Sequence, residues 1–285
     1  MADWSDGYWW SNDGLRLHYR DYAGDDARPP ILCIPGLTRN ARDFEGVAAR
    51  LGGDWRVLCL DLRGRGESAY AKDPMSYVPL TYMQDVEALL RELGLDRFIL
   101  FGTSLGGLVT MLLAPAHRGS LVGALINDVG PDLEPRGLDR IRSYVGQSRA
   151  WPTWMHAARH FAAAQADVYP RWGLEDWLRH AHRLCRLTPA GRVVFDYDMR
   201  IAEPFKLPGG PTGFDPWRAL DGLAGVPTLL VRGALSDLLT EATVARMLER
   251  DPAMEAVTVP DVGHAPTLEE PVAAVAIDRL LARTA

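Results

Sequence analysis

The segment from Phe98 to Gly107, FILFGTSLGG, places a serine between glycines where one hydrophobic pattern gives way to another. The apolar residues before it are typical of a buried strand, and the residues after it read as a buried helix that ends before a proline. A strand-to-helix turn this tight strains the backbone of Ser104, and the small residues Gly102 and Gly106 relieve the crowding. The turn lifts the hydroxyl clear of the sheet and aims the Leu105 amide at whatever the hydroxyl attacks. The segment therefore predicts a nucleophilic serine with half of an oxyanion hole.

The chain of 285 residues is long enough for one large core, and its 47% hydrophobic and 24% charged residues match an ordinary globular enzyme. The net charge is −6 with both signs mixed along the chain, so no basic face favours nucleic acid or an anionic membrane as a partner. The N-terminus is acidic, and no apolar run approaches the length of a membrane span. We expect a cytoplasmic protein that acts on a small molecule; the sequence leaves its oligomeric state open.

Neither a metal nor a cofactor is expected. Cys33 and Cys59 lie in predicted strands and Cys185 in a predicted helical stretch, without a C-x-x-C or Cys/His cluster. Buried free thiols are therefore favoured over a disulfide or a zinc site. The glycine-rich loop Leu62–Ser68 follows a strand, but it lacks both the G-x-G-x-x-G and the G-K-[ST] pattern of phosphate-binding loops.

Most of the chain alternates between short apolar strands and amphipathic helices. The first strand, Leu15–Tyr22, alternates apolar and polar residues, as an antiparallel edge strand does. Continuous apolar strands are predicted at Ile31–Ile34, Val57–Asp61, Leu121–Ile126, Pro227–Gly233 and Ala256–Pro260, and helices at Leu80–Leu93, Thr240–Leu248 and Leu268–Ala282. This order predicts an α/β fold with a doubly wound, mostly parallel sheet, whose functional site lies at the carboxyl ends of the strands.

Between about residues 131 and 216 the alternation breaks down, and the sequence becomes helical and rich in aromatic residues. We expect a helical cap at 131–216, inserted into an α/β core formed by 1–130 and 217–285. The expected cap helices are Leu138–Gln147, Thr153–Ala166 and Leu174–Leu187. The aromatic side chains of this segment together indicate an apolar pocket.

Four residues are candidates for substrate contact. Trp151 and Trp154 flank Pro152, which breaks the chain between two expected cap helices, and such a break tends to face the site. Tyr144 is the next candidate in the cap. Arg39, in the loop after an apolar strand, is the expected polar contact. Because other polar anchors are few, we expect compact and largely apolar substrates.

A serine hydroxyl needs a base within hydrogen-bond reach and an acid behind that base. His264 is the predicted base, because it lies on a loop after the last strand of the sheet while the remaining histidines lie in a strand, at a helix end or in the cap. Asp237 and Asp128 both follow strands by a few residues, and either could reach the imidazole. Asp237 is the favoured acid and Asp128 the alternative.

The loop after the strand Ile31–Ile34 is the natural donor of a second oxyanion amide. Gly36 permits a sharp bend that turns the amide of Leu37 inward. The amides of Leu37 and Leu105 would then face the same oxygen atom.

Four motifs together resemble those of the α/β-hydrolase fold superfamily: GTSLG at 102–106, DLRGRGES at 61–68, GALSD at 233–237 and the pair Gly263–His264. The resemblance covers almost all of the chain outside the cap. One departure is the oxyanion loop, where many relatives have His-Gly and this chain has Pro35–Gly36.

The resemblance implies a triad of Ser104, Asp237 and His264, with Leu37 and Leu105 as the oxyanion hole. Asp237 is favoured over Asp128 because the order Ser, Asp, His along the chain is that of this fold.

A serine at the strand-to-helix turn (the nucleophile elbow, Gly102–Gly106), in place of aspartate, argues against the haloalkane dehalogenases and epoxide hydrolases of the superfamily. The chain is most similar to capped esterases and lactonases, which implies hydrolysis of a carboxylic ester or lactone through an acyl-enzyme. A hydrolase that cleaves carbon-carbon bonds in ring-fission products is the alternative, with Arg142, Arg149 and Arg159 available to hold an acid. A ligand receptor of the same fold is a third reading, which an intact triad disfavours.

Overall fold

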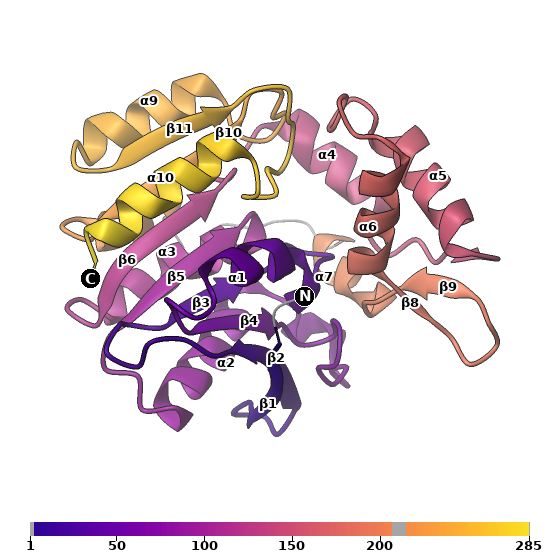
Figure 1. Cartoon of the computed structure of the whole chain (residues 1–285), viewed down its shortest axis with the longest axis horizontal. Helices are drawn as coiled ribbons and strands as arrows, with labels where there is room; N and C mark the ends of the chain where they lie inside the picture. The colour runs from indigo at the N-terminus through magenta and orange to yellow at the C-terminus, as the bar shows by residue number, and fades with distance from the viewer. Residues whose placement is uncertain (1–2, 207–214, 285) are drawn as a thin grey trace.

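The computed structural model describes residues 3–206 and 215–284, and an eight-stranded sheet runs through it in the order β1-β2-β4-β3-β5-β6-β10-β11 (Figure 1). The strands are β1 Ser5–Trp10, β2 Arg16–Tyr22, β3 Ile31–Ile34, β4 Val57–Asp61, β5 Phe98–Thr103, β6 Leu121–Asn127, β10 Thr228–Gly233 and β11 Glu255–Val259. The pairs β1–β2 and β2–β4 are antiparallel, and the pairs from β4 across to β11 are parallel. The predicted doubly wound, mostly parallel sheet is confirmed.

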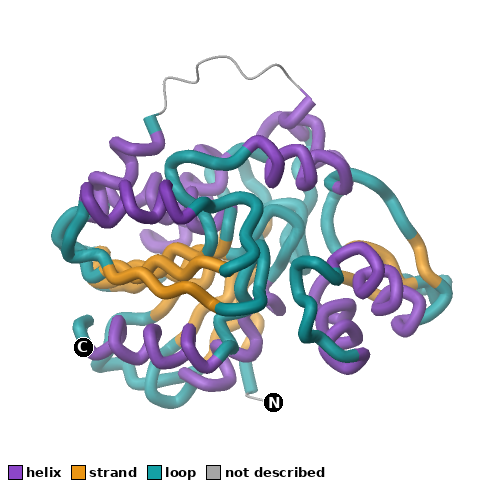
Figure 2. Tube along the Cα trace, turned by 90° about the horizontal axis from the view of Figure 1, so that it is seen from above, coloured by secondary structure: helices purple, strands orange, loops and turns teal. Residues whose placement is uncertain are grey.

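Helices cover both faces of the sheet, so that the strands lie between two helical layers (Figure 2). The covering helices are α1 Glu45–Leu51, α2 Pro79–Glu92, α3 Leu105–Leu113, α8 Pro216–Leu220, α9 Glu241–Arg250 and α10 Pro271–Ala282. Residues of α2, α3, α8 and α9 pack into one hydrophobic cluster, and residues of α1 and α10 pack into another.

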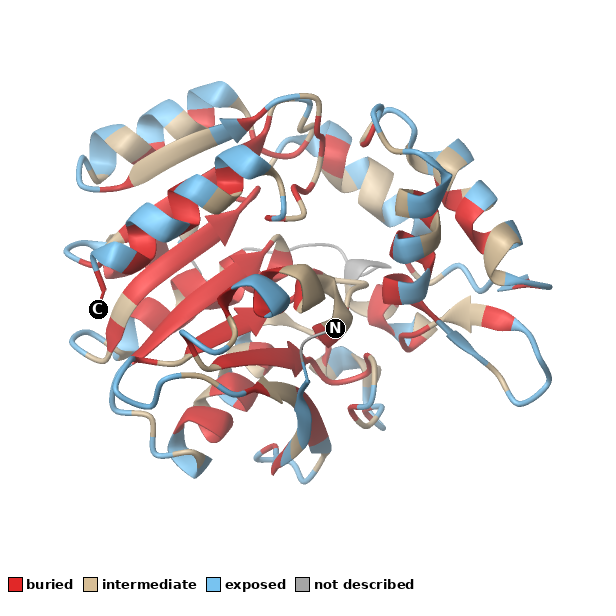
Figure 3. Cartoon of the chain, in the orientation of Figure 1, coloured by how far each residue is buried: buried red, intermediate tan, exposed pale blue. Residues whose placement is uncertain are grey.

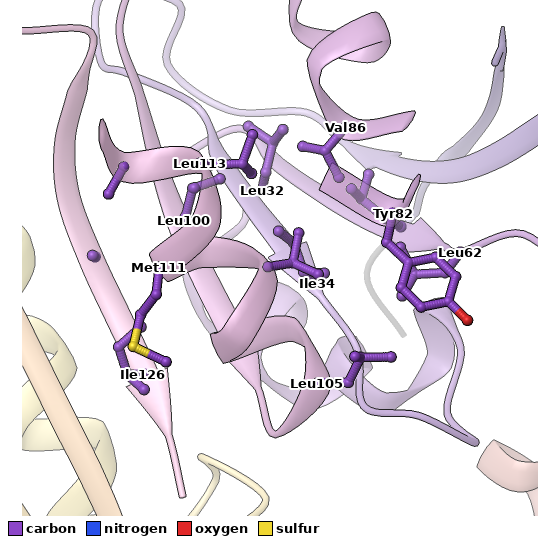
Figure 4. Close-up of a cluster of buried hydrophobic side chains, with 14 of the residues drawn as sticks. Leu32, Ile34, Leu62, Tyr82, Val86, Leu100, Leu105, Met111, Leu113 and Ile126 are labelled. Atoms are coloured by element: carbon purple, nitrogen blue, oxygen red, sulfur yellow. The ribbon is translucent and has the colours of Figure 1, made fainter. Parts of the chain in front are cut away.

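The central strands are buried on both faces, as their continuous apolar sequences require (Figure 3). Successive side chains of a strand point to opposite faces. Leu32 and Ile34 of β3 therefore join the cluster beneath α2 and α3 (Figure 4), whereas Ile31 and Cys33 join the cluster beneath α1 and α10. All three cysteines are buried and free.

No strand is predicted before Leu15, yet β1 pairs with β2 from Ser5 opposite Asp21 to Trp10 opposite Arg16. Most side chains of β1 are exposed because it forms the edge of the sheet, and Trp9 is its one fully buried side chain. An edge strand with so few buried residues carries little hydrophobic pattern, which is why the periodicity of the sequence did not predict it.

The segment between β6 and α8, here called the insertion, contains α4 Pro135–Tyr144, β7 Ala150–Trp151, α5 Trp154–Gln165, α6 Leu174–Leu184, β8 Cys185–Leu187, β9 Val193–Phe195 and α7 Glu203–Lys206. The three strands form a separate antiparallel sheet in the order β7-β9-β8. The expectation of a helical segment was therefore wrong at these strands, and the helix expected at Leu174–Leu187 ends at Leu184 because Cys185 pairs with Phe195. Residues 207–214 of the predicted cap lie outside the described residues.

Charged contacts hold the insertion against segments that follow the strands of the main sheet. Arg183 of α6 contacts Glu45 at 2.9 Å and Glu269 at 2.7 Å. Arg42, which follows β3, contacts Asp196 of the insertion at 2.6 Å. The insertion is thereby fixed beside the carboxyl ends of the strands. In the part of the chain that the structure describes, no helix is both long enough and apolar enough to cross a membrane.

Candidate active site

Ser104 occupies the turn between β5 and α3 with φ 52° and ψ −113°, a backbone conformation that residues with a side chain rarely adopt. The flanking glycines permit this turn. A Cβ atom on Gly102 would lie 2.3 Å from the carbonyl oxygen of Gly106, and one on Gly106 would lie 2.0 Å from the carbonyl oxygen of Ile34. Any side chain at either position would collide with backbone, so the G-x-S-x-G pattern follows from the packing of strand, turn and helix.

His264, in the loop after β11, lies between the serine and a carboxylate. Its Nε2 is 2.9 Å from Ser104 Oγ, and its Nδ1 is 2.8 Å from Asp128 Oδ2. The Asp128 side chain is completely buried and the His264 side chain is 8% exposed. An ionised carboxylate can only accept hydrogen bonds, so Nδ1 carries the proton and Nε2 is free to accept the serine proton.

Asp128 is held in place from two further directions. Its Oδ1 accepts from the Gly233 amide at 2.8 Å, and its Oδ2 accepts from Ser236 Oγ at 2.7 Å. These donors come from the end of β10 and the loop behind it, while Asp128 itself follows β6. Neighbouring parallel strands thus bring the carboxylate and its donors together at one edge of the sheet.

Asp237, the predicted acid, does not hydrogen-bond to His264. Its carboxylate accepts from Nε and Nη2 of Arg140 in α4, at 2.6 Å and 2.7 Å. The Arg140 hydrogen bonds hold the pKa of Asp237 below its usual value, against the smaller opposing effect of burial. The geometry therefore corrects the prediction, and Asp128 takes the position beside the imidazole. The cause is the ion pair with the insertion, which spacing along the chain does not show.

The two amides predicted to form an oxyanion hole lie near the serine. Leu105 is the first residue of α3, where the backbone N–H has no acceptor within the helix. A Cβ atom on Gly36 would lie 3.7 Å from Ser104 Cβ, so the loop that carries Leu37 runs beside the serine. The Leu37 carbonyl accepts from Nε of the buried Arg65 at 2.9 Å, which fixes the orientation of this loop. The role of the two amides stays a prediction.

Two cavities adjoin the site, one lined in part by Ser104 and the other by His264. The first, here the apolar cavity, has a volume of 290 Å³ and is lined by Leu37, Tyr77, Val78, Pro79, Tyr82, Ser104, Leu105, Leu108, Val129, Leu133, Leu138, Ile141, Pro204 and Leu238. The second, here the polar cavity, has a volume of 220 Å³ and is lined by Thr38, Arg39, Arg140, Ser143, Tyr144, His160, Phe161, Ala164, Gln165, Val168, Leu184, Phe195, Tyr197 and His264. Helix α4 contributes to both cavities.

Arg39 and Tyr144 line the polar cavity, but neither predicted tryptophan lines either cavity among the described residues. Trp151 is 8% exposed and packs edge-on against Phe195, with ring centres 5.1 Å apart. Trp154 stacks on His182 at 3.9 Å. Both predictions were wrong because the break at Pro152 joins β7 to α5 and turns the two rings into the packing of the insertion. The expectation of few polar anchors was also wrong, since the polar cavity holds two arginines.

The model of a family described as the alpha/beta hydrolase family matches residues 31–279 of the chain. The chain belongs to the alpha/beta hydrolase family. The predicted superfamily, fold class and hydrolase activity are thereby confirmed.

This hydrolase is 37% identical over 266 residues to a 3-hydroxybutyrate-oligomer hydrolase of Cupriavidus necator, a match that covers 90% of this chain and 89% of that protein. It is 28% identical over 258 residues to an esterase of Mycobacterium tuberculosis, covering 88% of this chain and 82% of the esterase. Among solved structures, an alpha/beta hydrolase of Novosphingobium aromaticivorans superposes with a TM-score of 0.95 at 57% identity, covering 99% of each chain.

Sequence reasoning missed several residues that shape the site of this hydrolase. Arg65 and Ser236 lie inside the GRGES and GALSD motifs. The sequence showed these motifs, but it did not show that Arg65 donates to the Leu37 carbonyl or that Ser236 donates to Asp128. Arg140 lies in a predicted cap helix, and no local signal connects it to Asp237 across the 97 positions that separate them.

Proposed function

We propose that the protein is a carboxylic ester hydrolase that works through an acyl-enzyme on Ser104. The observation that carries the proposal is the hydrogen-bonded chain from Ser104 Oγ through His264 to Asp128, with contacts of 2.9 Å and 2.8 Å. A nucleophile, a base and an orienting acid in this order are what acyl transfer by serine requires.

In the first half of the reaction, Ser104 Oγ attacks the ester carbonyl while His264 Nε2 takes the hydroxyl proton. Asp128 keeps the other imidazole nitrogen protonated and stabilises the imidazolium that forms. The amides of Leu37 and Leu105 donate to the oxyanion. The imidazolium then gives its proton to the leaving alcohol. In the second half, His264 takes a proton from water, the water attacks the acyl group, and Ser104 is released.

The cavities and the relatives together support a proposal for the substrate class. A cavity of 290 Å³ with apolar walls beside Ser104 favours a short aliphatic acyl group. The relative at 37% identity is named for oligomers of 3-hydroxybutyrate, which are esters of a short hydroxy acid. We therefore propose that short-chain esters, with hydroxy-acid oligomers foremost and lactones also included, are the substrates.

We propose that the insertion, predicted at 131–216, acts as the cap of this site. Its helix α4 supplies Leu138 and Ile141 to the apolar cavity and Tyr144 to the polar cavity. A substrate at Ser104 would thus be enclosed between the sheet and the insertion, which excludes bulk water from the acyl-enzyme.

The test is a substrate panel assayed with the wild type, Ser104→Ala and Ser120→Ala. The panel contains p-nitrophenyl butyrate, a 3-hydroxybutyrate dimer, an aryl lactone and a ring-fission dienoate. Ser120 is a matched control because it precedes β6, at the amino ends of the parallel strands, whereas Ser104 follows β5 at their carboxyl ends. We expect ester cleavage by the wild type and Ser120→Ala, and a loss on the order of 10⁶ in kcat for Ser104→Ala.

A fluorophosphonate probe gives an independent readout. The intact mass of the wild type should rise by one covalent adduct, and that of Ser104→Ala should not. Ester turnover by a folded Ser104→Ala variant, or cleavage of the dienoate alone, would contradict the proposal.

A further inference from the structure

We infer that the polar cavity is the leaving-group subsite for an alcohol that carries a carboxylate, and that Arg39 anchors this carboxylate. The inference rests on the proposed ester hydrolysis and adds a direction to it: the enzyme removes a hydroxy acid from the carboxylate end of an ester chain.

The orientation of the substrate follows from the position of the base. After the attack, His264 Nε2 must hand its proton to the oxygen of the leaving alcohol, so the alcohol lies on the side of the imidazole. The acyl carbon is bonded to Ser104 Oγ, and its oxygen faces the amides of Leu37 and Leu105. His264 lines the polar cavity, whereas Ser104, Leu37 and Leu105 line the apolar cavity. The acyl group therefore enters the apolar cavity and the alcohol enters the polar one.

The two arginines of the polar cavity differ in how many of their guanidinium N–H groups are hydrogen-bonded to a carboxylate. Arg140 makes a two-point contact with Asp237, through Nε and Nη2 at 2.6 Å and 2.7 Å. Arg39 contacts Asp43 through Nη1 alone, at 3.0 Å. A guanidinium has five N–H donors in a fork that matches a carboxylate, so Arg39 keeps donors for a second anion.

The charges around the cavity fit an anionic guest. Arg39 and Arg140 line the cavity, and no acid does so among the described residues; Asp43 and Asp237, which lie behind the two arginines, are each paired with one of them. Although burial lowers the pKa of Arg39, the nearby Asp43 and Tyr169 raise it overall, and the side chain stays charged at any working pH. The Arg39 side chain is 20% exposed, and in such a partly desolvated place a charge-assisted hydrogen bond is stronger than at a free surface.

The remaining walls are mixed, because Phe161, Val168, Leu184 and Phe195 are apolar and four further residues are polar. Ser143 and Tyr144 of α4 and His160 and Gln165 of α5 bring hydroxyl, imidazole and amide groups to the cavity. The polar cavity, at 220 Å³, is small for a ligand site. The two cavities therefore favour one arrangement of the substrate. A single hydroxy acid lies in the polar cavity, and the rest of the ester chain lies on the acyl side.

The reaction balances as a simple hydrolysis. The bond between the acyl carbon and the alcohol oxygen breaks, and the alcohol oxygen takes the proton that His264 received from Ser104. Water supplies the hydroxyl group of the new acid. The products are a shortened chain with a new carboxylate and one free hydroxy acid, and the shortened chain can bind again in the same way.

The experiment compares a 3-hydroxybutyrate dimer as the free acid with the same dimer ended by a neutral primary carboxamide. The ratio of kcat/KM for acid over carboxamide is measured in the wild type, Arg39→Met, Arg39→Lys and Arg142→Met. Arg142 is a matched control because it is an exposed arginine of α4 that lines neither cavity among the described residues. Trimer digests followed by chromatography over time report which end is released first.

We expect a ratio above about tenfold in the wild type and in Arg142→Met, a ratio near one in Arg39→Met, and an intermediate ratio in Arg39→Lys, which keeps the charge without the fork. A wild-type ratio near one, or a ratio that survives in Arg39→Met, would overturn the inference while ester hydrolysis stands. Absence of turnover on the carboxamide, the free acid and p-nitrophenyl butyrate alike would instead refute the proposed function.

Discussion

Asp128→Asn is the substitution that most directly separates the two candidate acids. Asparagine keeps the size of the side chain but replaces one acceptor oxygen by an NH₂ donor. In the structure, Oδ1 accepts from the Gly233 amide at 2.8 Å, and Oδ2 accepts from His264 at 2.8 Å and Ser236 at 2.7 Å. The Gly233 N–H belongs to the backbone of β10 and cannot turn away. The asparagine oxygen must therefore face Gly233, because two facing buried donors would cost about 1–3 kcal/mol.

This orientation points the asparagine NH₂ group at His264 Nδ1. Nδ1 then becomes an acceptor, the imidazole proton moves to Nε2, and Nε2 can no longer take the proton of Ser104. Loss of the correct tautomer in a serine triad lowers kcat about 10⁴-fold, which corresponds to about 5.5 kcal/mol of transition-state stabilisation. We expect a loss of this order for Asp128→Asn on p-nitrophenyl butyrate.

Asp237→Asn is the matched control, since the same change is made to the other acid that follows a strand. It weakens the contact with Arg140 but leaves the tautomer of His264 unchanged. We expect its kcat/KM to stay within about tenfold of the wild type, a change of about 1.4 kcal/mol. Thermal unfolding and near-ultraviolet circular dichroism check that both variants are folded. If Asp237→Asn lost as much activity as Asp128→Asn, or more, the assignment of the acid from the structure would be refuted.

Three further outcomes are expected. Trp151→Ala should lower the free energy of unfolding by about 3–5 kcal/mol, because the ring is buried, and should leave the ranking of ester substrates unchanged; a changed ranking would place the ring in the pocket after all. Gly102→Ala should abolish soluble folded enzyme or its activity, since the added Cβ atom would lie 2.3 Å from a backbone oxygen, and wild-type expression and kinetics would contradict this. Burial, helped by the charges of Arg39 and Arg183, holds the pKa of His180 well below 6.5. As the pH falls, His180 is therefore protonated in the unfolded chain before it is protonated in the folded one. The free energy of unfolding should thus decrease below about pH 6.5, by up to about 1.4 kcal/mol per pH unit. Urea unfolding at pH 7.5, 6.5 and 5.5 should show a flatter pH dependence for His180→Leu than for the wild type, and parallel curves would count against it.

The sequence alone determined the parts of this protein that depend on local pattern. The elbow around Ser104 was predictable because its strand, its glycines and its helix are adjacent along the chain. The parallel sheet was predictable because strands buried on both faces have continuous apolar sequences. The position of His264 followed in turn, since residues that come after parallel strands gather at one edge of the sheet.

Only the tertiary structure decided which groups meet at that edge. Asp128 and Asp237 both follow strands by a short distance, and their spacing to His264 does not distinguish them. The choice between them depends on Arg140, which reaches Asp237 from the insertion, and on the Gly233 amide, which holds Asp128 toward the imidazole. The orientations of Trp151 and Trp154 were also decided by tertiary packing. An aromatic residue beside a chain break has the same local sequence pattern whether its ring faces a pocket or packs within its own segment. Contacts between segments far apart in sequence set these outcomes, and packing rather than periodicity determines such contacts.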